Sequence, residues 1–286
     1  MRIHHLNCVT MCPIGGRLMD GRSRSLWRGR LTCHCLLIET GSALTLVDTG
    51  FGLRDVADPT GRLSRFFLAE VRPDLREEMT AIRQIEALGL DPADVRDIVL
   101  THLDFDHAGG LDDFPQATVH LLAAEAEAAR DRPTPIARGR YRPQQWGPQG
   151  RWQLYPSGGG EPWFAFASVR DLVGLPPEVL LVPLAGHTAG HAGVAIAHGD
   201  GWLLHAGDAY FHHHELDGGR CPIGVRGYQR MMDTDREARL ANQERLRELD
   251  RRHGAEMRTF CAHDPDEFER LALRPEWVPA EAPALV

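Results

Sequence analysis

The stretch from residue 98 to 110 constrains this chain more than any other part of its sequence. It reads Ile-Val-Leu-Thr-His-Leu-Asp-Phe-Asp-His-Ala-Gly-Gly. The opening Ile-Val-Leu is a short apolar run of the kind that fills a buried strand, and the closing Gly-Gly lets the backbone turn sharply. Between them lie the ionisable side chains of His102, Asp104, Asp106 and His107.

Imidazole and carboxylate groups are the side chains that bind Zn, Fe or Mn in proteins. On a loop at the end of a strand, they are held by a rigid sheet while the metal stays open to substrate. The alternative is an ordinary polar turn, because Asp and Gly are common in turns. Such turns seldom contain two His and two Asp at alternating positions, so the sequence favours a metal-binding loop.

Further segments of the chain supply more side chains of this kind. They are Gly186-His187-Thr188-Ala189-Gly190-His191, Gly207-Asp208-Ala209 and Phe260-Cys261-Ala262-His263-Asp264. With these segments downstream, the first loop resembles the metal signature of the metallo-β-lactamase superfamily, which usually reads His-x-His-x-Asp-His. This chain departs from that signature at Asp104, where most members carry His, and at Ala189, which replaces Pro.

The resemblance implies an α/β fold, the four-layer αβ/βα sandwich, formed by residues 1–286 as a single domain. It also implies two divalent transition metals that share Asp208, with Zn as the first expectation and Fe or Mn as alternatives. His102, Asp104 and His187 would hold one metal, and Asp106, His107 and His263 the other. Asp106 or Asp208 would carry a proton to the leaving group. Tyr210 would donate to a substrate carbonyl, although similar lactonases place such a Tyr three residues after the bridging Asp rather than two.

Within the superfamily, the loop His-Leu-Asp-Phe-Asp-His-Ala-Gly-Gly is most similar to that of the acyl-homoserine lactonases. This implies a hydrolase that uses a metal-bound hydroxide on a lactone or carboxylic ester, with a small molecule as its partner. Glyoxalase II-like thioesterases and phosphate or sulfate esterases use the same metal platform and stay open as alternatives. A diiron redox protein is an alternative of another class, because flavodiiron proteins carry an acidic residue at the position of Asp104. Their additional flavin domain does not fit within 286 residues.

The composition of 43% hydrophobic and 25% charged residues is typical of a soluble globular protein. A net charge of −8 disfavours nucleic acid or an anionic membrane as the main partner. No apolar run approaches the ~18 residues of a membrane span, and the first residues lack the apolar core of a signal peptide. We therefore expect a cytoplasmic protein, in which Cys33 and Cys35 are core thiols.

The segment at about 131–178 is rich in Pro, Trp, Tyr and Phe and contains Gly158-Gly159-Gly160. Long irregular stretches inside compact domains are usually functional or disordered, and the aromatic residues argue against disorder. We interpret this segment as a lid or pocket wall; a packed surface excursion or a homodimer contact is the alternative. Arg138, Arg140 and Arg142 alternate within it, as a solvated face or as a clamp for an anion.

Elsewhere the chain alternates predicted strands and helices. One helix is predicted at 74–88 with Asp74 as its N-cap, and another from Thr234 to His253. A strand at 43–48 ends in Asp48. By the resemblance this Asp would support the metal site, whereas a strand-ending turn is the alternative.

Overall fold

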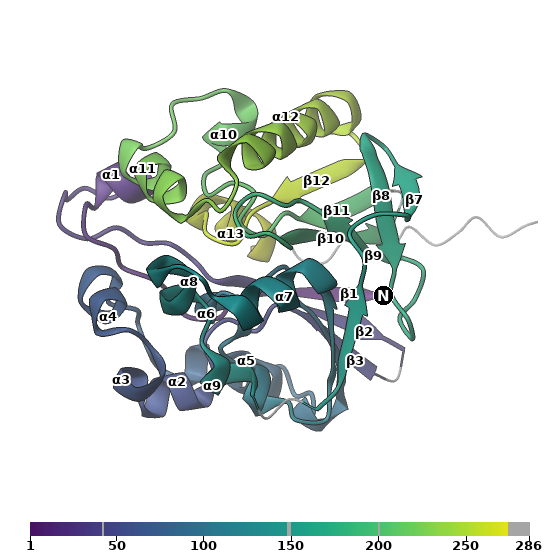
Figure 1. Ribbon diagram of the computed structural model, residues 1–286, viewed down its shortest axis with the longest axis horizontal. Helices are drawn as coiled ribbons and strands as arrows, with labels where there is room; N and C mark the ends of the chain where they lie inside the picture. The colour runs from purple at the N-terminus through teal and green to yellow at the C-terminus, as the bar shows by residue number, and fades with distance from the viewer. Residues whose placement is uncertain (42, 148–149, 200, 274–286) are drawn as a thin grey trace, which may run out of the picture.

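The computed structural model describes residues 1–41, 43–147, 150–199 and 201–273. These residues form two six-stranded sheets that face each other, with helices on the outer face of each sheet (Figure 1). The four-layer αβ/βα sandwich expected from the sequence is therefore confirmed.

The first sheet has the strand order β1-β2-β3-β4-β5-β6. Strands β1, β2 and β3 pair in antiparallel fashion, whereas β3, β4, β5 and β6 run parallel to one another. The bounds are β1 Arg2–Asn7, β2 His34–Thr40, β3 Ala43–Val47, β4 Val95–Val99, β5 Thr118–Leu122 and β6 Trp152–Tyr155.

The second sheet has the strand order β12-β11-β10-β9-β8-β7. Strands β11 and β12 run parallel, and the other neighbours pair in antiparallel fashion. The bounds are β7 Glu161–Trp163, β8 Phe166–Asp171, β9 Val179–Pro183, β10 Ala192–His198, β11 Gly201–His205 and β12 Met257–Phe260.

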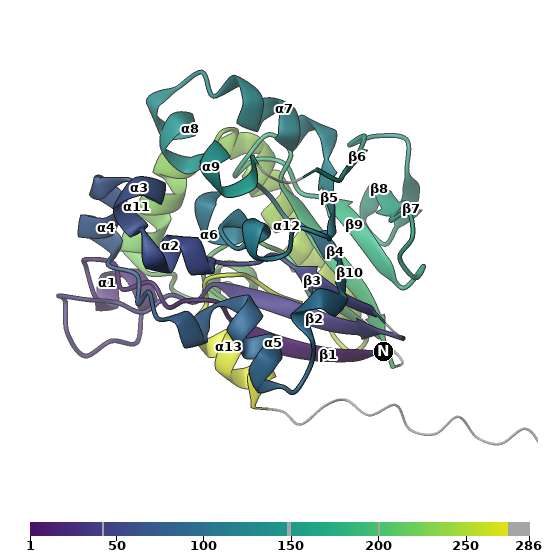
Figure 2. The same cartoon turned by 90° about the horizontal axis from the view of Figure 1, so that it is seen from below.

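A core of branched aliphatic side chains fills the space between the two sheets. Leu36, Val47 and Val99 from the first sheet pack here against Leu181 and Val194 from the second. On the outer faces, α5 (Ala81–Ala87) and α7 (Ala123–Asp131) cover the first sheet, and α12 (Arg236–His253) covers the second. Figure 2 shows α5 and α13 (Pro265–Ala272) near β1. Burial of apolar strand faces on both sides of each sheet stabilises this architecture.

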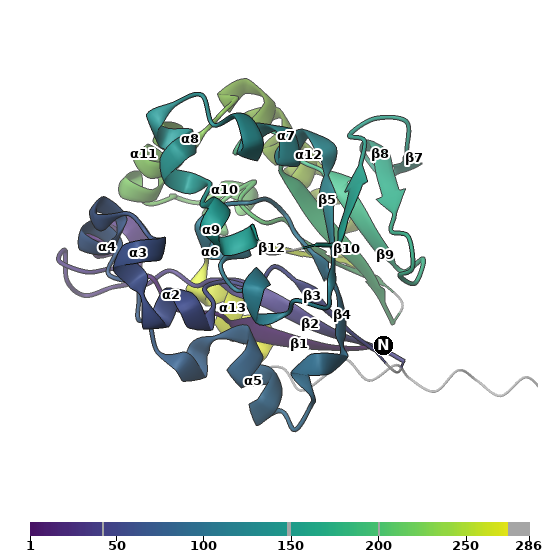
Figure 3. The same ribbon diagram turned by 60° about the horizontal axis from the view of Figure 1, so that its bottom comes forward.

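The remaining helices are short and gather largely at one end of the sandwich, away from the N-terminus (Figure 3). They are α1 Arg17–Asp20, α2 Leu53–Ala57, α3 Pro59–Arg62, α4 Arg65–Val71, α6 Phe105–Ala108, α8 Pro135–Arg140, α9 Pro143–Trp146, α10 His214–Asp217 and α11 Ile223–Met232, with 3₁₀ turns at Glu77–Met79, Pro92–Asp94 and Leu111–Asp113. Within the described ranges, no helix combines the length and apolar character needed to cross a bilayer.

Two of the predicted helices begin later than expected. The region 74–88 forms a 3₁₀ turn at Glu77–Met79 and then α5, because Thr80 adopts an extended backbone and its hydroxyl donates to the carbonyl of Glu77. Helix α12 is capped by Asp235, whose carboxylate accepts the N–H of Ala238, rather than by Thr234. Both errors concern helix ends, where neighbouring polar residues compete for the same role.

The segment 131–178 is more regular than expected, because it contains α8, α9 and strands β6, β7 and β8. Its aromatic side chains mostly belong to the packed cores. Trp163 and Phe166 pack under the second sheet, Tyr155 lies between the sheets, and Tyr141 packs under the first sheet. Side chains that are held in a core are not free to form a mobile lid.

Candidate metal centre

Strand ends bring the predicted metal-binding residues together. The loop with His102 follows β4, His187 follows β9, Asp208 follows β11 and His263 follows β12. Strands β9 and β11 both pair antiparallel to β10, and β12 runs parallel to β11, so their carboxyl ends lie at the same edge. All seven predicted ligands are buried here: His102, Asp104, Asp106, His107, His187, Asp208 and His263.

Four of these residues form what we call the first cage: His102, Asp104, His187 and Asp208. The Nε2 atom of His187 lies 3.2 Å from Oδ2 of Asp104 and 3.3 Å from Oδ2 of Asp208. The Nε2 atom of His102 lies 3.4 Å and 3.8 Å from the same two oxygens.

The second cage consists of Asp106, His107, Asp208 and His263. Oδ1 of Asp208 lies 3.3 Å from Nε2 of His107 and 3.2 Å from Nε2 of His263. The Nε2 atom of His263 also lies 3.7 Å from Oδ2 of Asp106. Nε2 of His263 is also 3.2 Å from Oδ2 of Asp208, so the Asp208 carboxylate lies between the two cages and contacts residues of both.

The two cages have the dimensions of metal sites. Four ligand atoms placed tetrahedrally at about 2.0–2.1 Å from Zn are roughly 3.3–3.4 Å apart, close to the separations in both cages. Nε2 of His102, Nε2 of His107 and Oδ1 of Asp208 are buried without a hydrogen-bond partner. Buried polar atoms rarely lack a partner, and a cation would satisfy these atoms. The donor set fits a divalent metal.

Hydrogen bonds on the opposite ring nitrogen orient three of the imidazoles. Nδ1 of His107 is 2.8 Å from Oδ2 of Asp48, and Nδ1 of His263 is 2.7 Å from the carbonyl of Thr32. Nδ1 of His102 is 2.9 Å from the hydroxyl of Thr101, which also donates to Asp48. Asp48 thus makes the contact expected of a residue that supports a metal ligand, and such contacts fix the tautomer of a metal-binding His.

Glu125 on α7 ties two ligand-bearing loops together. Its Oε1 atom accepts the backbone N–H of Leu103, and its Oε2 atom accepts the N–H of Gly190. A Cβ atom at Gly190 would collide with the backbone of Glu125, so this close approach requires glycine. No motif around Glu125 marks it in the sequence.

Arg140, at the end of α8, forms a bidentate ion pair with Asp104. Its Nε and Nη2 atoms donate to the two carboxylate oxygens of Asp104, each at 2.7 Å. Nη2 is also 2.7 Å from Nε2 of His187. Asp104 therefore faces the first cage, as expected, but carries a buried cationic partner.

A model of the metallo-beta-lactamase superfamily matches residues 28–252. The chain belongs to this superfamily. It is 45% identical over 273 residues to a probable metallo-hydrolase of Mycobacterium tuberculosis, which covers 94% of this chain and 82% of that protein. It is 29% identical over 236 residues to the N-acyl homoserine lactonase AttM of Azorhizobium caulinodans, which covers 81% of each chain. This chain is thus a metallo-hydrolase of the superfamily.

The fold is also that of solved superfamily structures. An N-acyl homoserine lactone hydrolase, with the product N-hexanoyl-L-homoserine bound at its catalytic metal centre, superposes with a TM-score of 0.72 and 22% identity. The alignment covers 97% of this chain and 98% of the other. The dizinc quorum-quenching lactonase AidC superposes with a TM-score of 0.60 and 17% identity.

The charges in this superfamily site shift the acidities of its carboxylates. Burial alone would raise the pKa of Asp208, but the facing imidazoles of His263 and His107 hold this pKa well below its ordinary value. Burial opposes the ionisation of Asp104 in the same way, and the guanidinium of Arg140 keeps the Asp104 pKa well below its ordinary value. Both carboxylates are therefore anionic and suited to a cation.

Tyr210 does not play the role that was predicted from its position after Asp208. Its hydroxyl donates to the carboxylate of Glu267 at 3.0 Å, and the side chain is fully buried in the core under the second sheet. Donation to a substrate would break that hydrogen bond in the core. The structure directs the hydroxyl to Glu267, a direction that residue spacing alone does not show.

Tyr228 on α11 is a better placed phenol, and the sequence reasoning missed it. Burial and the negative charges of Asp106 and Asp104 raise its pKa above the ordinary value, so its phenol is neutral beside the cages. Its ring lies 5.9 Å from that of Phe211, which contacts the rings of His187 and His263. No motif of the superfamily marks Tyr228, since it lies on a helix far from every ligand segment.

Cys33 and His191 lie beside the cages. Cys33 packs in an apolar cluster, as expected of a core thiol, but its sulfur also lies within 4.8 Å of ligand atoms of Asp106 and His263. Nε2 of His191 accepts the backbone N–H of Asp208 at 2.8 Å, and Nδ1 lies 3.0 Å from the carbonyl of Leu184. His191 thus holds the backbone of Asp208 with Nε2 and that of Leu184 with Nδ1, which leaves neither nitrogen for a metal.

The three alternating arginines act separately, so neither a common solvated face nor an anion clamp describes them. Arg138 is exposed and donates to the carbonyl of Pro133, whereas Arg142 donates to the carbonyl of Arg62. Only Arg140 reaches the cages. Arg62 in turn pairs with Asp55 and donates to the carbonyl of Gly109. These contacts stabilise the end of the loop at residues 101–110, which we call the metal loop.

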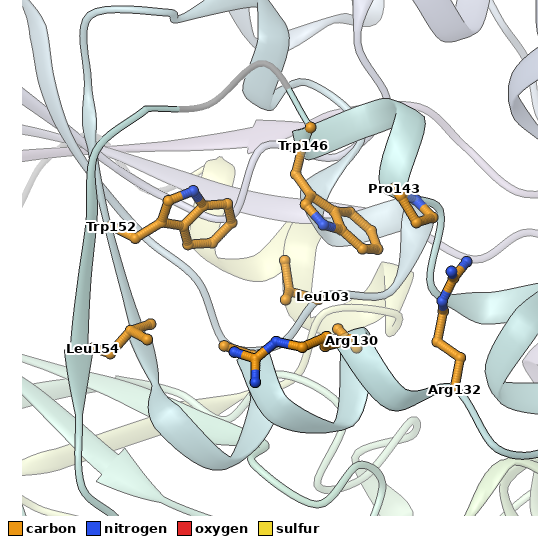
Figure 4. A pocket seen from close by; sticks show the side chains of 10 residues that line it. Leu103, Arg130, Arg132, Pro143, Trp146, Trp152 and Leu154 are labelled. Carbon is orange, nitrogen blue, oxygen red and sulfur yellow. The ribbon is translucent and has the colours of Figure 1, made fainter.

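A cavity of about 530 Å³ lies behind the metal loop (Figure 4). Leu103, between the ligands His102 and Asp104, lines it together with Trp146, Trp152 and Arg130. Since Leu103 lines this cavity while its neighbours face the cages, the cavity is separate from the carboxylate cluster.

Proposed function

We propose that this protein hydrolyses lactones or other carboxylic esters at a divalent metal centre. The observation that carries the proposal is the pair of cages that share Asp208, with unpartnered His102, His107 and Asp208 atoms aimed into them. The similarity to a lactonase over 81% of the chain supports the choice of ester chemistry.

A divalent metal bound here would lower the pKa of water toward neutrality and polarise a substrate carbonyl. The residues of the chain would do the rest. Asp208 would hold both cages in register through its two oxygens. Asp106 or Asp208 would move a proton to the leaving alkoxide, and the neutral phenol of Tyr228 would donate to the substrate oxygen that gains charge.

An apolar tail on the substrate is supported by the surface around the site. Exposed large apolar side chains occur on α1, α4, α8 and α11, which gather at the end of the molecule that holds α6. Examples are Phe66 at 74% exposure, Ile223 at 69% and Trp27, in the loop after α1, at 67%. Exposed apolar groups on neighbouring elements can contribute to a ligand or interaction surface. We propose that an acyl chain lies against this surface, to which the segment 131–178 contributes α8.

A series of N-acyl homoserine lactones of increasing acyl length tests this proposal. Each CH₂ that becomes buried contributes roughly 0.8 kcal/mol, so kcat/KM should rise with acyl length over several carbons. The chain should lose this activity when a chelator removes its metal. If the protein hydrolyses only phosphate esters, sulfate esters or thioesters, the proposed substrate class is wrong. If activity persists after complete removal of the metal, the proposed mechanism is wrong. Asp97→Asn, which alters the Asp97–His120 contact outside the centre, serves as the matched control.

The sequence also leads to expectations about the metal, the domain organisation, the location and the oligomeric state. We propose zinc as the resident metal, a single domain, a cytoplasmic location and a homodimer as the state to be tested by sedimentation. A diiron redox centre is less well supported, since the acidic residue on which it rests, Asp104, is bound through both oxygens by Arg140.

A further inference from the structure

We propose that Arg140 is the resident cation of the first cage, so that the chain tightly holds a single metal ion, in the second cage. This inference rests on the metal centre of the proposed function. It begins from the departure at Asp104, where the usual imidazole ligand is replaced by a carboxylate.

Arg140 is fixed in place by every part of its guanidinium. Nε and Nη2 hold Asp104, and Nη1 donates to the carbonyls of His187 and Met232 at 3.1 and 2.9 Å. The side chain is only 3% exposed. A bidentate Arg–carboxylate pair in such surroundings is geometrically specific and strong, so a metal cannot displace it at low cost.

Arg140 and a metal compete for the same nitrogen lone pair. Nη2 of Arg140 lies 2.7 Å from Nε2 of His187, the atom that faces the first cage. An imidazole nitrogen has one lone pair in the ring plane, so it accepts from the guanidinium or binds a metal, but not both. Occupation of the first cage by a metal therefore requires Arg140 to move.

His187 also lacks the support that the other imidazoles have. Its Nδ1 atom is buried without a hydrogen-bond partner. By contrast, Nδ1 of His107 contacts Asp48 and Nδ1 of His263 contacts the carbonyl of Thr32. Loss of such an outer contact typically weakens metal binding roughly 10–100-fold. The second cage is thus the better built of the two.

The charge balance leads to the same conclusion. A His ligand is neutral, so Asp104 adds a negative charge to the first cage, and the guanidinium of Arg140 cancels that charge within the protein. Before any metal enters, the carboxylate of Asp208, which the two cages share, is therefore the one uncompensated negative charge of the first cage. In the second cage, Asp106 and Asp208 face His107 and His263, and no Arg or Lys forms an ion pair with either carboxylate among the described residues.

The decisive experiment counts metals by elemental analysis, after loading with zinc and passage over a chelating resin. The wild type should retain a single ion. The double variant Asp104→His/Arg140→Met, which restores the usual ligand without leaving a buried unpaired charge, should retain a second ion. Arg138→Met, on the same helix but exposed, is the matched control and should behave as the wild type. Circular dichroism and thermal melting of each variant establish that it is folded.

Single ligand variants and manganese spectroscopy make the test independent of the double variant. His263→Ala should lose the retained ion, whereas His187→Ala should keep it. Mn²⁺ in the wild type should show the electron paramagnetic resonance of an isolated ion. Two retained ions in the wild type, a spectrum of coupled Mn²⁺ ions, or loss of the ion in His187→Ala but not in His263→Ala would overturn the role of Arg140. A wild type that retains no metal would instead overturn the proposed function.

Discussion

Asp48 holds His107 from behind, with 2.8 Å between its Oδ2 atom and Nδ1 of the imidazole. The same carboxylate accepts the backbone N–H and the hydroxyl of Thr101. It therefore connects the end of β3 to a residue of the second cage through fully buried contacts. Its left-handed backbone, with φ of 56°, places the carboxylate at this junction.

Replacement of Asp48 by Asn should weaken metal binding roughly 10–100-fold, because the amide stabilises a metal-bound His107 less than a carboxylate does. Competition with a chromophoric chelator measures this change. Asp97→Asn offers a matched Asp–His contact outside the centre and should leave metal affinity unchanged. Equal affinities of Asp48→Asn and the wild type would show that the contact does not act on the metal.

We expect replacement of Tyr228 to affect catalysis and replacement of Tyr210 to affect stability. Tyr228→Phe should lower kcat for ester hydrolysis by roughly 10²-fold with metal content unchanged, since it removes a donor beside the cages. Tyr210→Phe should leave kcat near the wild-type value but lower the free energy of unfolding by about 1–3 kcal/mol, because Glu267 loses its buried donor. Steady-state kinetics and urea unfolding of both variants decide between these roles, and the reverse pattern would restore the role first expected of Tyr210.

Glu125→Ala should destabilise the protein by about 3 kcal/mol, because the N–H groups of Leu103 and Gly190 lose their acceptor. It should also weaken metal binding, since Leu103 lies between His102 and Asp104 and Gly190 belongs to the loop that carries His187. Glu127→Ala, at an exposed position of the same helix, should change stability by less than about 0.5 kcal/mol. Chemical unfolding together with metal competition tests both effects. Similar results for the two variants would argue against the bracing role.

Asp113 should make stability depend on pH. Burial raises the pKa of Asp113 from 3.8 to about 7, although the N–H of Leu53 donates to it. A carboxyl whose folded pKa is raised binds its proton more tightly in the folded state, so its stabilisation is complete below pH 3.8 and is lost as the pH rises to about 7.

Asp113→Asn should therefore gain stability relative to the wild type as the pH rises from 4 to 7, by up to roughly 3 kcal/mol, since one pKa unit corresponds to about 1.4 kcal/mol. Asp112→Asn should instead lose stability at pH 7, because Asp112 pairs with Arg62 at 3.0 Å. Urea unfolding across this pH range measures both differences. If the gain in the free energy of unfolding of Asp113→Asn is the same at every pH, ionisation of Asp113 is not its cause.

Local sequence motifs, through their resemblance to those of the superfamily, were enough to predict the fold class and the candidate ligands. His102, Asp106 and Asp208 each follow an apolar strand, and the carboxyl ends of neighbouring parallel strands meet at one edge of a sheet. Which side chains occur, and whether they directly follow a strand, can be read from a short stretch of sequence. Asp48 belongs to the same class, since it ends β3 beside β4.

Only the tertiary structure decided the partners that come from other elements. Arg140 meets Asp104 across 36 residues of sequence, and Glu125 reaches Gly190 across 65. Tyr228, and not Tyr210, lies beside the cages. Helix α11 brings Tyr228 next to Phe211, whereas the ring of Tyr210 is buried in the core under the second sheet. Such contacts depend on how helices and loops pack on the sheets, and no local pattern of residues encodes that packing.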